Sequence, residues 1–212
     1  MSRQFATLTP KLQASVPGCP HGTILQYIRD AAIRACERTL AWRHQVPVFN
    51  FTPGVQEYPF VTPANTNAHA ILEVLVNNWP MRRLTLNQAT AAYPQWTVSG
   101  SPRVVTQLGP ASYAVLPVPD TARPYQCRMF LALKPSRDAV LMDVAVFDEL
   151  EEVIMHGALQ HLLVLPDQIW SDRELAAYHA KQFVFQVAER RARAELGNAR
   201  ATLVVQPQPF GN

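Results

Sequence analysis

Cysteines and histidines are the side chains in this sequence best suited to bind a metal or to act as nucleophiles. Cys19 and His21 lie two positions apart, and Cys36 and His44 could join them in a folded chain. Zinc sites, however, usually combine cysteines separated by two residues or histidines four positions apart on a helix. The spacing therefore indicates no metal, and Cys36 is expected to pack as a small apolar residue on a buried helix face.

A second group of ionisable residues lies between positions 148 and 161. His156 and His161 are five positions apart, so on a helix their side chains point in different directions and do not converge on one ion; they are expected to pack or cap. Four carboxylates could be mistaken for a catalytic pair: Asp148, Glu149, Glu151 and Glu152. They fall opposite an apolar stripe near a helix N-terminus, so a solvated, dipole-favoured face explains them.

No complete catalytic or nucleotide-binding motif accompanies these residues. The sequence contains no nucleophile, base and orienting group at the spacing of a known catalytic motif. The eight glycines are isolated, and none forms a phosphate-binding loop beside a Lys-Ser or Lys-Thr pair. The sequence therefore predicts a protein that is not an enzyme and that uses no cofactor.

Positive charge is densest toward the C-terminal end, at Lys181, Arg190, Arg191, Arg193 and Arg200. These side chains could face DNA or an acidic protein surface. The alternative is a solvated helix face with internal ion pairs, such as Glu189 with Arg193. A formal net charge of only +3 permits a polyanion nearby, without the charge density of a dedicated nucleic-acid module.

Candidate contacts with other subunits lie at one tryptophan and in the last residues. The four tryptophans are spread along the chain, which favours core or interface anchors over a stacking platform for bases. The final segment, NARATLVVQPQPFGN, is too short and proline-rich to form a core, so it either extends onto a neighbouring chain or stays disordered. The predicted interface residues are Trp170, Val204, Val205, Pro207, Pro209 and Phe210.

The composition suggests that part of the protein surface is covered by partner molecules. Charged residues make up 17% of the 212 residues, below the roughly 25% of ordinary soluble domains, and apolar residues make up 48%. Three scattered cysteines are too few for a disulfide framework and suit a reducing compartment. No stretch approaches the roughly 18 uninterrupted apolar residues of a membrane span, so a soluble protein without membrane contact is expected.

Three long helices are predicted from the apolar spacing. The first covers 21–44, bounded by Pro20 and Pro47. The second begins near Asp143 and ends at Pro166. The third begins at Ser171, with Glu174 three positions later as a reciprocal capping box, and ends near residue 196 with Gly197 as its stop.

Short β-type runs broken by Pro, Asn and Gly fill the region between the first two helices. The predicted strands are 46–51, 56–60, 70–76, 112–117 and 126–133, and residues 84–101 are expected to form a loop or a short helix. The fold class is therefore α+β: a helical bundle with an inserted antiparallel sheet or small barrel. The predicted regions are a helical part at 1–45 and 142–200, a β-rich part at 46–141 and an extended arm at 201–212.

Several stretches together resemble the head-to-tail connector, or adaptor, proteins of tailed bacteriophages, particularly the short-tailed type that docks below the portal ring. The first is VPGCPHGTILQYIRDAAIRACERTLAWRH, at 16–44. The second is ELEEVIMHGALQHLLVLPDQIWSDRELAAYHAKQFVFQVAERRA, at 149–192, which is similar to the adaptor helical hairpin. The proline-rich insertion between them matches more loosely, through Tyr58-Pro59, Pro94-Gln95-Trp96 and residues 116–119.

This resemblance implies a structural subunit in the virion neck, assembled in the host cytoplasm. It implies a homo-oligomeric ring, commonly of twelve copies, with helices docked on the portal protein and a β-rich part toward the downstream tail or nozzle protein. DNA would pass through the lumen with non-specific contact, and residues 202–212 would grip the portal. Neither cofactor nor catalysis is implied.

Two other functions remain open from the sequence. A DNA-binding module using the segment 190–200 predicts steeply salt-dependent affinity of the monomer for duplex DNA. A virion-associated hydrolase using carboxylates of residues 148–152 as acid and base predicts that Glu149→Gln and Glu152→Gln abolish the activity.

Overall fold

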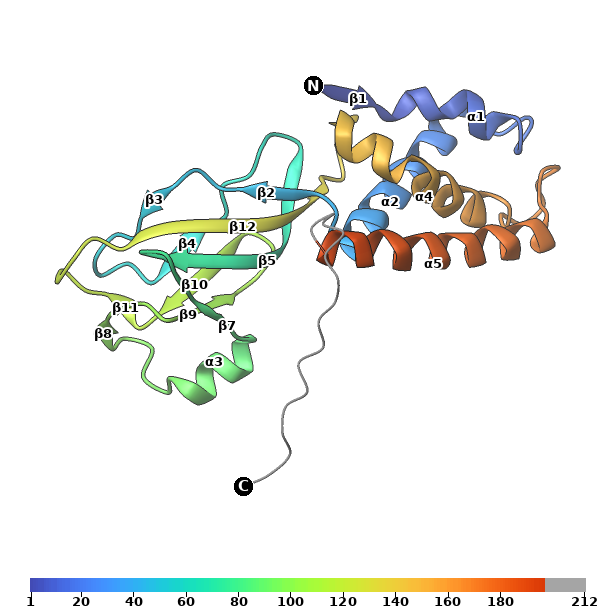
Figure 1. Cartoon of the computed structure of the whole chain (residues 1–212). Coiled ribbons are helices and arrows are strands. Elements are labelled where there is room, and N and C mark those ends of the chain that lie inside the picture. The colour runs from blue at the N-terminus through green and yellow to red at the C-terminus, as the bar shows by residue number, and fades with distance from the viewer. Residues whose placement is uncertain (197–212) are drawn as a thin grey trace.

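The computed structural model describes residues 1–196 and shows an elongated molecule with a helical part beside a β-rich part (Figure 1). The chain passes between the two parts after α2 (His21–Thr39) and again before α4 (Val144–Leu162). The α+β class predicted from the sequence is confirmed. The predicted helix stop and the predicted C-terminal contacts lie outside the described residues: Gly197, Arg200, Val204, Val205, Pro207, Pro209 and Phe210.

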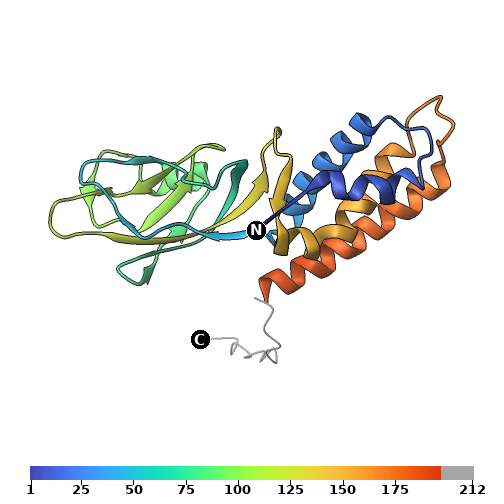
Figure 2. The ribbon, with the colours of Figure 1, turned by 90° about the horizontal axis from the view of Figure 1, so that it is seen from above.

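Three long helices, α2, α4 and α5 (Arg173–Glu195), make up most of the helical part. Helix α4 packs against both of the others, and α2 and α5 lie along opposite edges in the view from above (Figure 2). Gly157 of α4 allows this close approach, because a Cβ there would lie 2.9 Å from the Phe183 ring and 3.1 Å from the Ala31 Cβ. The apolar stripes of all three helices therefore meet in one core.

The first residues form an N-terminal strap, residues 1–16, that sequence analysis left unassigned. Strand β1 (Ser2–Gln4) pairs antiparallel with β13 (Leu141–Asp143), followed by the 3-10 helix η1 (Phe5–Leu8) and the short helix α1 (Thr9–Gln13). Four apolar side chains of the strap are buried in the helical core: Phe5, Leu8, Leu12 and Val16. The strap is thus part of the core, although its pieces are too short to show a periodicity.

The β-rich part is built around the long antiparallel pair of β5 (Thr66–Val76) and β12 (Gln126–Pro135). This pair belongs to a five-stranded sheet with β2 (Arg43–Gln45), β3 (Phe49–Asn50) and β6 (Trp79–Pro80). The second sheet has the order β4 (Glu57–Pro59), β10 (Ser112–Leu116), β9 (Val104–Gln107) and β7 (Arg82–Arg83).

Aromatic side chains connect the two sheets. Phe49 of β3 lies near Tyr58 of β4, with ring centroids 6.5 Å apart, and Tyr58 stacks on Tyr113 of β10 at 5.7 Å. Phe51 and Phe60 complete the cluster. Such aromatic contacts bury large apolar area and explain why this segment is rich in Phe and Tyr.

Each of the five predicted strand segments contains a strand, but the barrel alternative is wrong. Within residues 1–196 the strands form separate open sheets, and two pairs are parallel: β7 with β9, and β8 (Ser99–Gly100) with β11 (Val118–Pro119). The arrangement is therefore not purely antiparallel. The segment 84–101 contains the helix α3 (Leu86–Ala92), whose start is fixed by a capping box between Thr85 and Gln88.

The predicted cap of the third long helix is wrong by one residue. Asp172 is the N-cap of α5, and its carboxylate accepts a hydrogen bond from the Leu175 backbone N–H at 2.9 Å. Ser171 instead donates its hydroxyl to the Leu165 carbonyl, which holds the turn between α4 and α5. Ser and Asp are both good N-cap residues, but the negative carboxylate of Asp172 is additionally stabilised by the positive end of the helix dipole.

Candidate interface surfaces

The basic residues of α5 are largely engaged within the chain. Arg193 pairs with Glu189, as predicted, and Arg191 pairs with Glu195 at 2.9 Å. Arg191 also donates to the Arg38 carbonyl at 3.3 Å, which ties α5 to the end of α2. These contacts neutralise part of the charge that would otherwise attract DNA.

The other two described members of this set lie in different surroundings. The Nε atom of Arg190 is buried and has no hydrogen-bond partner within residues 1–196. Lys181 is exposed two and a half turns earlier on the helix. The structure therefore does not gather the predicted basic residues into one continuous stripe.

Trp170, the predicted interface anchor in the α4–α5 turn, is half-buried and packs against the helical core. Its indole N–H is buried without a hydrogen-bond partner among the described residues. The adjacent Ile169 is 88% exposed and Val164 is 51% exposed, so these apolar side chains of the turn face outward.

A stripe of exposed side chains, in which Tyr178 and Phe185 are the large apolar members, runs along one face of α5, and sequence analysis missed it. Its members alternate at spacings of four and three residues, and all are exposed: Glu174, Tyr178, Lys181, Phe185, Ala188 and Ala192. Phe185 is 67% exposed and Tyr178 is 51% exposed. This outer ridge has the spacing of helices that pack against another helix. The helical spacing of Tyr178 and Phe185 is visible in the sequence, but the same helix also carries a buried apolar stripe, and the two cannot be told apart by spacing alone.

A polar groove of about 930 Å³, the α2 groove, lies between the exposed side of α2 and the end of β12. Six charged residues line it: Arg29, Asp30, Arg34, Glu37, Lys134 and Arg137. Lys134 pairs with Glu37 at 2.6 Å, and Arg29 donates to the Ala139 carbonyl at 2.9 Å.

Arg34 is the unusual residue of this groove. Its Nε and one terminal nitrogen are buried with no hydrogen-bond partner in the described part of the chain. Burial lowers the pKa of the Arg34 guanidinium, with nearby Asp30 acting in the opposite direction. Because a desolvated charge without a partner is costly, Arg34 is the least compensated charge of this groove.

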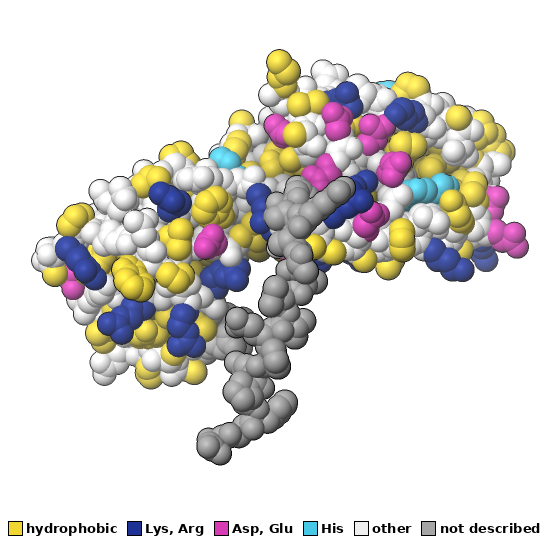
Figure 3. All heavy atoms as spheres, in the orientation of Figure 1, with side chains coloured by type: hydrophobic (Ala, Val, Ile, Leu, Met, Phe, Trp, Pro, Cys, Tyr) yellow, Lys and Arg dark blue, Asp and Glu magenta, His cyan; other side chains and the backbone are white. Residues whose placement is uncertain are grey.

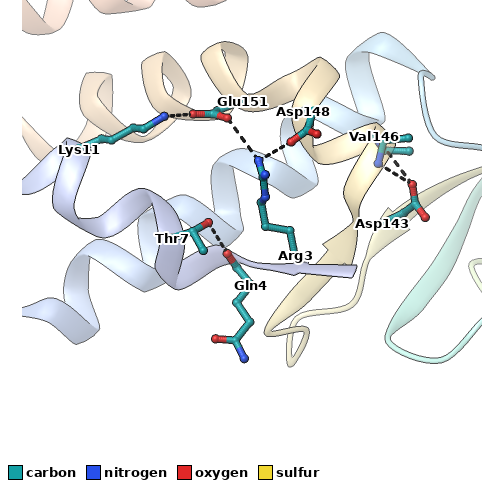
Figure 4. Close-up of polar contacts among 9 residues, drawn as sticks. Arg3, Gln4, Thr7, Lys11, Asp143, Val146, Asp148 and Glu151 are labelled. Atoms are coloured by element: carbon teal, nitrogen blue, oxygen red, sulfur yellow. Dashed lines mark hydrogen bonds and ion pairs between the residues drawn. The ribbon is translucent and has the colours of Figure 1, made fainter. Parts of the chain in front are cut away.

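Ion pairs hold the N-terminal strap on α4 (Figure 4). Arg3 pairs with Asp148, and its guanidinium also lies 3.8 Å from the Glu151 carboxylate. Lys11, which lies in α1, pairs with Glu151. Asp148 and Glu151 are thus structural partners rather than solely solvated charges, and Figure 3 shows acidic and basic side chains intermixed over the helical part.

Two histidines meet between α4 and α5, a contact that sequence analysis did not foresee. The Nδ1 atoms of His156 and His179 are 2.7 Å apart, which requires that one nitrogen carries a hydrogen and the other does not. Burial lowers the pKa of both imidazoles, and Glu152 partly opposes this at His156. His156 and His161 do not converge, as their spacing predicted; the partner of His156 comes from another helix.

The three cysteines are buried and unpaired by disulfides. Burial raises the pKa of the Cys19, Cys36 and Cys127 thiols, so they are poor nucleophiles. Cys36 packs in the helical core, as predicted. Across residues 1–196, no cluster of three or more His, Cys, Asp or Glu side chains could hold a metal ion.

Comparison with known proteins identifies the family. A family model described as SU10 adaptor protein matches residues 4–206, which is nearly the whole chain. The chain belongs to this family, and the resemblance to phage head-to-tail adaptors is confirmed. Members are structural proteins of bacteriophages, so the family places this chain among the components of the virion neck. A search of curated proteins gave no match.

None of the helices within residues 1–196 is both long enough and apolar enough to span a membrane.

Proposed function

We propose that this protein is a non-enzymatic adaptor subunit that forms a ring, of twelve copies, between the portal and the tail of a phage. DNA passes through the lumen of this ring with only non-specific contact. The observation that carries the proposal is the family match over residues 4–206, which includes both the helical and the β-rich part. The outer ridge of α5 supports it, because large exposed apolar side chains such as Tyr178 and Phe185 suit contact with another chain.

Each part of the chain has a role in this proposal. The helical part, 1–45 and 142–200, acts as a three-helix bundle that docks on the portal protein. The β-rich part, 46–141, faces the downstream tail or nozzle protein. Residues 201–212 form an arm that grips the portal, with Trp170 supporting the same interface. No membrane and no cofactor take part.

The test is native mass spectrometry with negative-stain imaging of the purified protein, alone and mixed with its portal protein. We expect a closed ring in at least one of the two samples. A protein that stays monomeric in both would contradict the proposal.

The arm is tested separately by deleting residues 202–212. We expect the truncated protein to keep its thermal midpoint and to lose attachment to the portal, measured by co-sedimentation. Attachment equal to that of the intact chain would remove the arm from the proposal and leave the adaptor role in place.

A further inference from the structure

Helices α2 and α5 lie along opposite edges of the helical part (Figure 2), and the α2 groove is lined by residues of α2 whereas the outer ridge is formed by exposed side chains of α5. Contacts between copies in a ring are heterologous, so each copy must present two different surfaces that fit one another. An interface of this kind leaves one surface of each type exposed on the isolated chain. The ridge and the groove meet this requirement.

The ridge offers large side chains, and the groove offers a hollow that can receive them. On the ridge, Tyr178 and Phe185 have 51% and 67% of their surface exposed. Beyond them the small side chains of Ala188 and Ala192 permit close approach of another helix. The groove is a hollow of about 930 Å³, and the half-buried Ile33 of α2 is among the residues that line it.

The ridge and the groove also carry charged side chains that can pair with one another. Glu174 and Lys181 of the ridge form no ion pair within residues 1–196. In the groove Asp30 and Arg34 are likewise without an ion pair in the described chain, and Arg34 is only half-buried where it lines the groove. The accessible part of the Arg34 guanidinium can pair with a carboxylate from a second copy, and the ridge carries one, Glu174, beside its aromatic side chains.

We propose that the outer ridge of one copy packs into the α2 groove of the next, with Tyr178 and Phe185 as the anchors and Glu174 facing Arg34. This contact, repeated around the ring, deepens the proposed function and rests on it. The occupant of the groove is a second copy of this chain, and the portal binds elsewhere.

The first test compares two neighbouring exposed positions on α5. Phe185→Glu changes the ridge, whereas Val184→Glu changes a side chain that is 59% exposed and points about 100° away around the helix. Ring formation is measured by native mass spectrometry and sedimentation, with the portal present if the wild type needs it. We expect Phe185→Glu to weaken assembly at least tenfold and Val184→Glu to assemble like the wild type.

A charge exchange and a cross-link test the pairing itself. Arg34→Glu should weaken assembly, and adding Glu174→Arg should restore it. Because the native cysteines are buried, a chain carrying Ile33→Cys and Phe185→Cys should give a ladder of oligomers with a short thiol cross-linker, while each single variant stays unlinked.

The outcomes separate this inference from the function on which it rests. A wild type that never forms a ring, with or without portal, overturns both. Rings formed equally well by wild type and Phe185→Glu, or the absence of a cross-linked ladder from a ring-forming double variant, overturn only the ridge-and-groove contact. If both glutamate variants fail to assemble, the cross-linking result decides.

Discussion

Gly157 is the residue on which the packing of the three long helices depends most directly. Its hydrogen lies where a Cβ would be 2.9 Å from Phe183 and 3.1 Å from Ala31. We expect Gly157→Ala to lower the free energy of unfolding by about 2 kcal/mol, because neither helix can retreat without opening the core. Urea denaturation followed by circular dichroism measures the change.

Gly22 provides the matched control, since it also lies in a helix but has nothing within 4 Å of the added Cβ. Gly22→Ala should leave stability unchanged or raise it by about 0.5 kcal/mol. Equal effects of the two substitutions would show that the contact at Gly157 is less tight than described.

The histidine pair predicts a pH dependence of stability. Burial lowers the folded-state pKa of His156 and His179 below the ordinary value of 6.5, so the unfolded chain binds more protons in that range. The stability contribution is therefore present above pH 6.5 and is lost as the pH falls through and below it. We expect the thermal midpoint to fall on acidification across this range.

The double variant His156→Gln with His179→Gln isolates this effect. Its thermal midpoint should depend less steeply on pH than that of the wild type, although some slope remains because burial also lowers the pKa of His69 and His161. An unchanged slope would mean that the pair does not govern the response.

At the scale of elements, the N-terminal strap is fixed by partly exposed ion pairs over a buried apolar side. Replacing Arg3 and Lys11 together by glutamine should lower the free energy of unfolding by about 1 kcal/mol at low salt, and by less at high salt. Chemical denaturation at two salt concentrations measures this. Arg128→Gln is the control: it removes an exposed positive charge that has no ion pair within residues 1–196, and its effect should be near zero.

Sequence patterns predicted helices at the positions of α2, α4 and α5, and the position of the β-rich part, because each long helix carries its own apolar stripe over many turns. The helix predicted at 21–44 nevertheless ends at Thr39, and Arg43–Gln45 form β2. The patterns did not predict β1, η1 or α1, whose few residues are ordered by contact with β13, α2 and α4 rather than by local preference. The candidate interface surfaces were still harder to predict from the sequence. Neither the His156–His179 contact nor the burial of Arg34 can be read from spacing, since each depends on how two separate segments meet.

At the scale of the whole molecule, the distribution of charge bears on DNA binding. Arg191 and Arg193 are paired with glutamates, and Lys181 lies apart from them. We expect the isolated chain to bind a short duplex no more tightly than the roughly 10⁻⁴–10⁻⁶ M of non-specific association at physiological salt. Fluorescence anisotropy over a salt series measures this; submicromolar binding lost on replacing both arginines by glutamine would favour the DNA-binding alternative.

The pairing of β1 with β13 also governs when the protein can finish folding during its synthesis. Ser2 has no strand partner until Asp143 has left the ribosome, so about two thirds of the chain must be translated first. Until then the apolar side chains at the start of the chain have no core to enter and are available to chaperones. Contacts of such long sequence separation form slowly, so the first residues to be made are among the last to take their place.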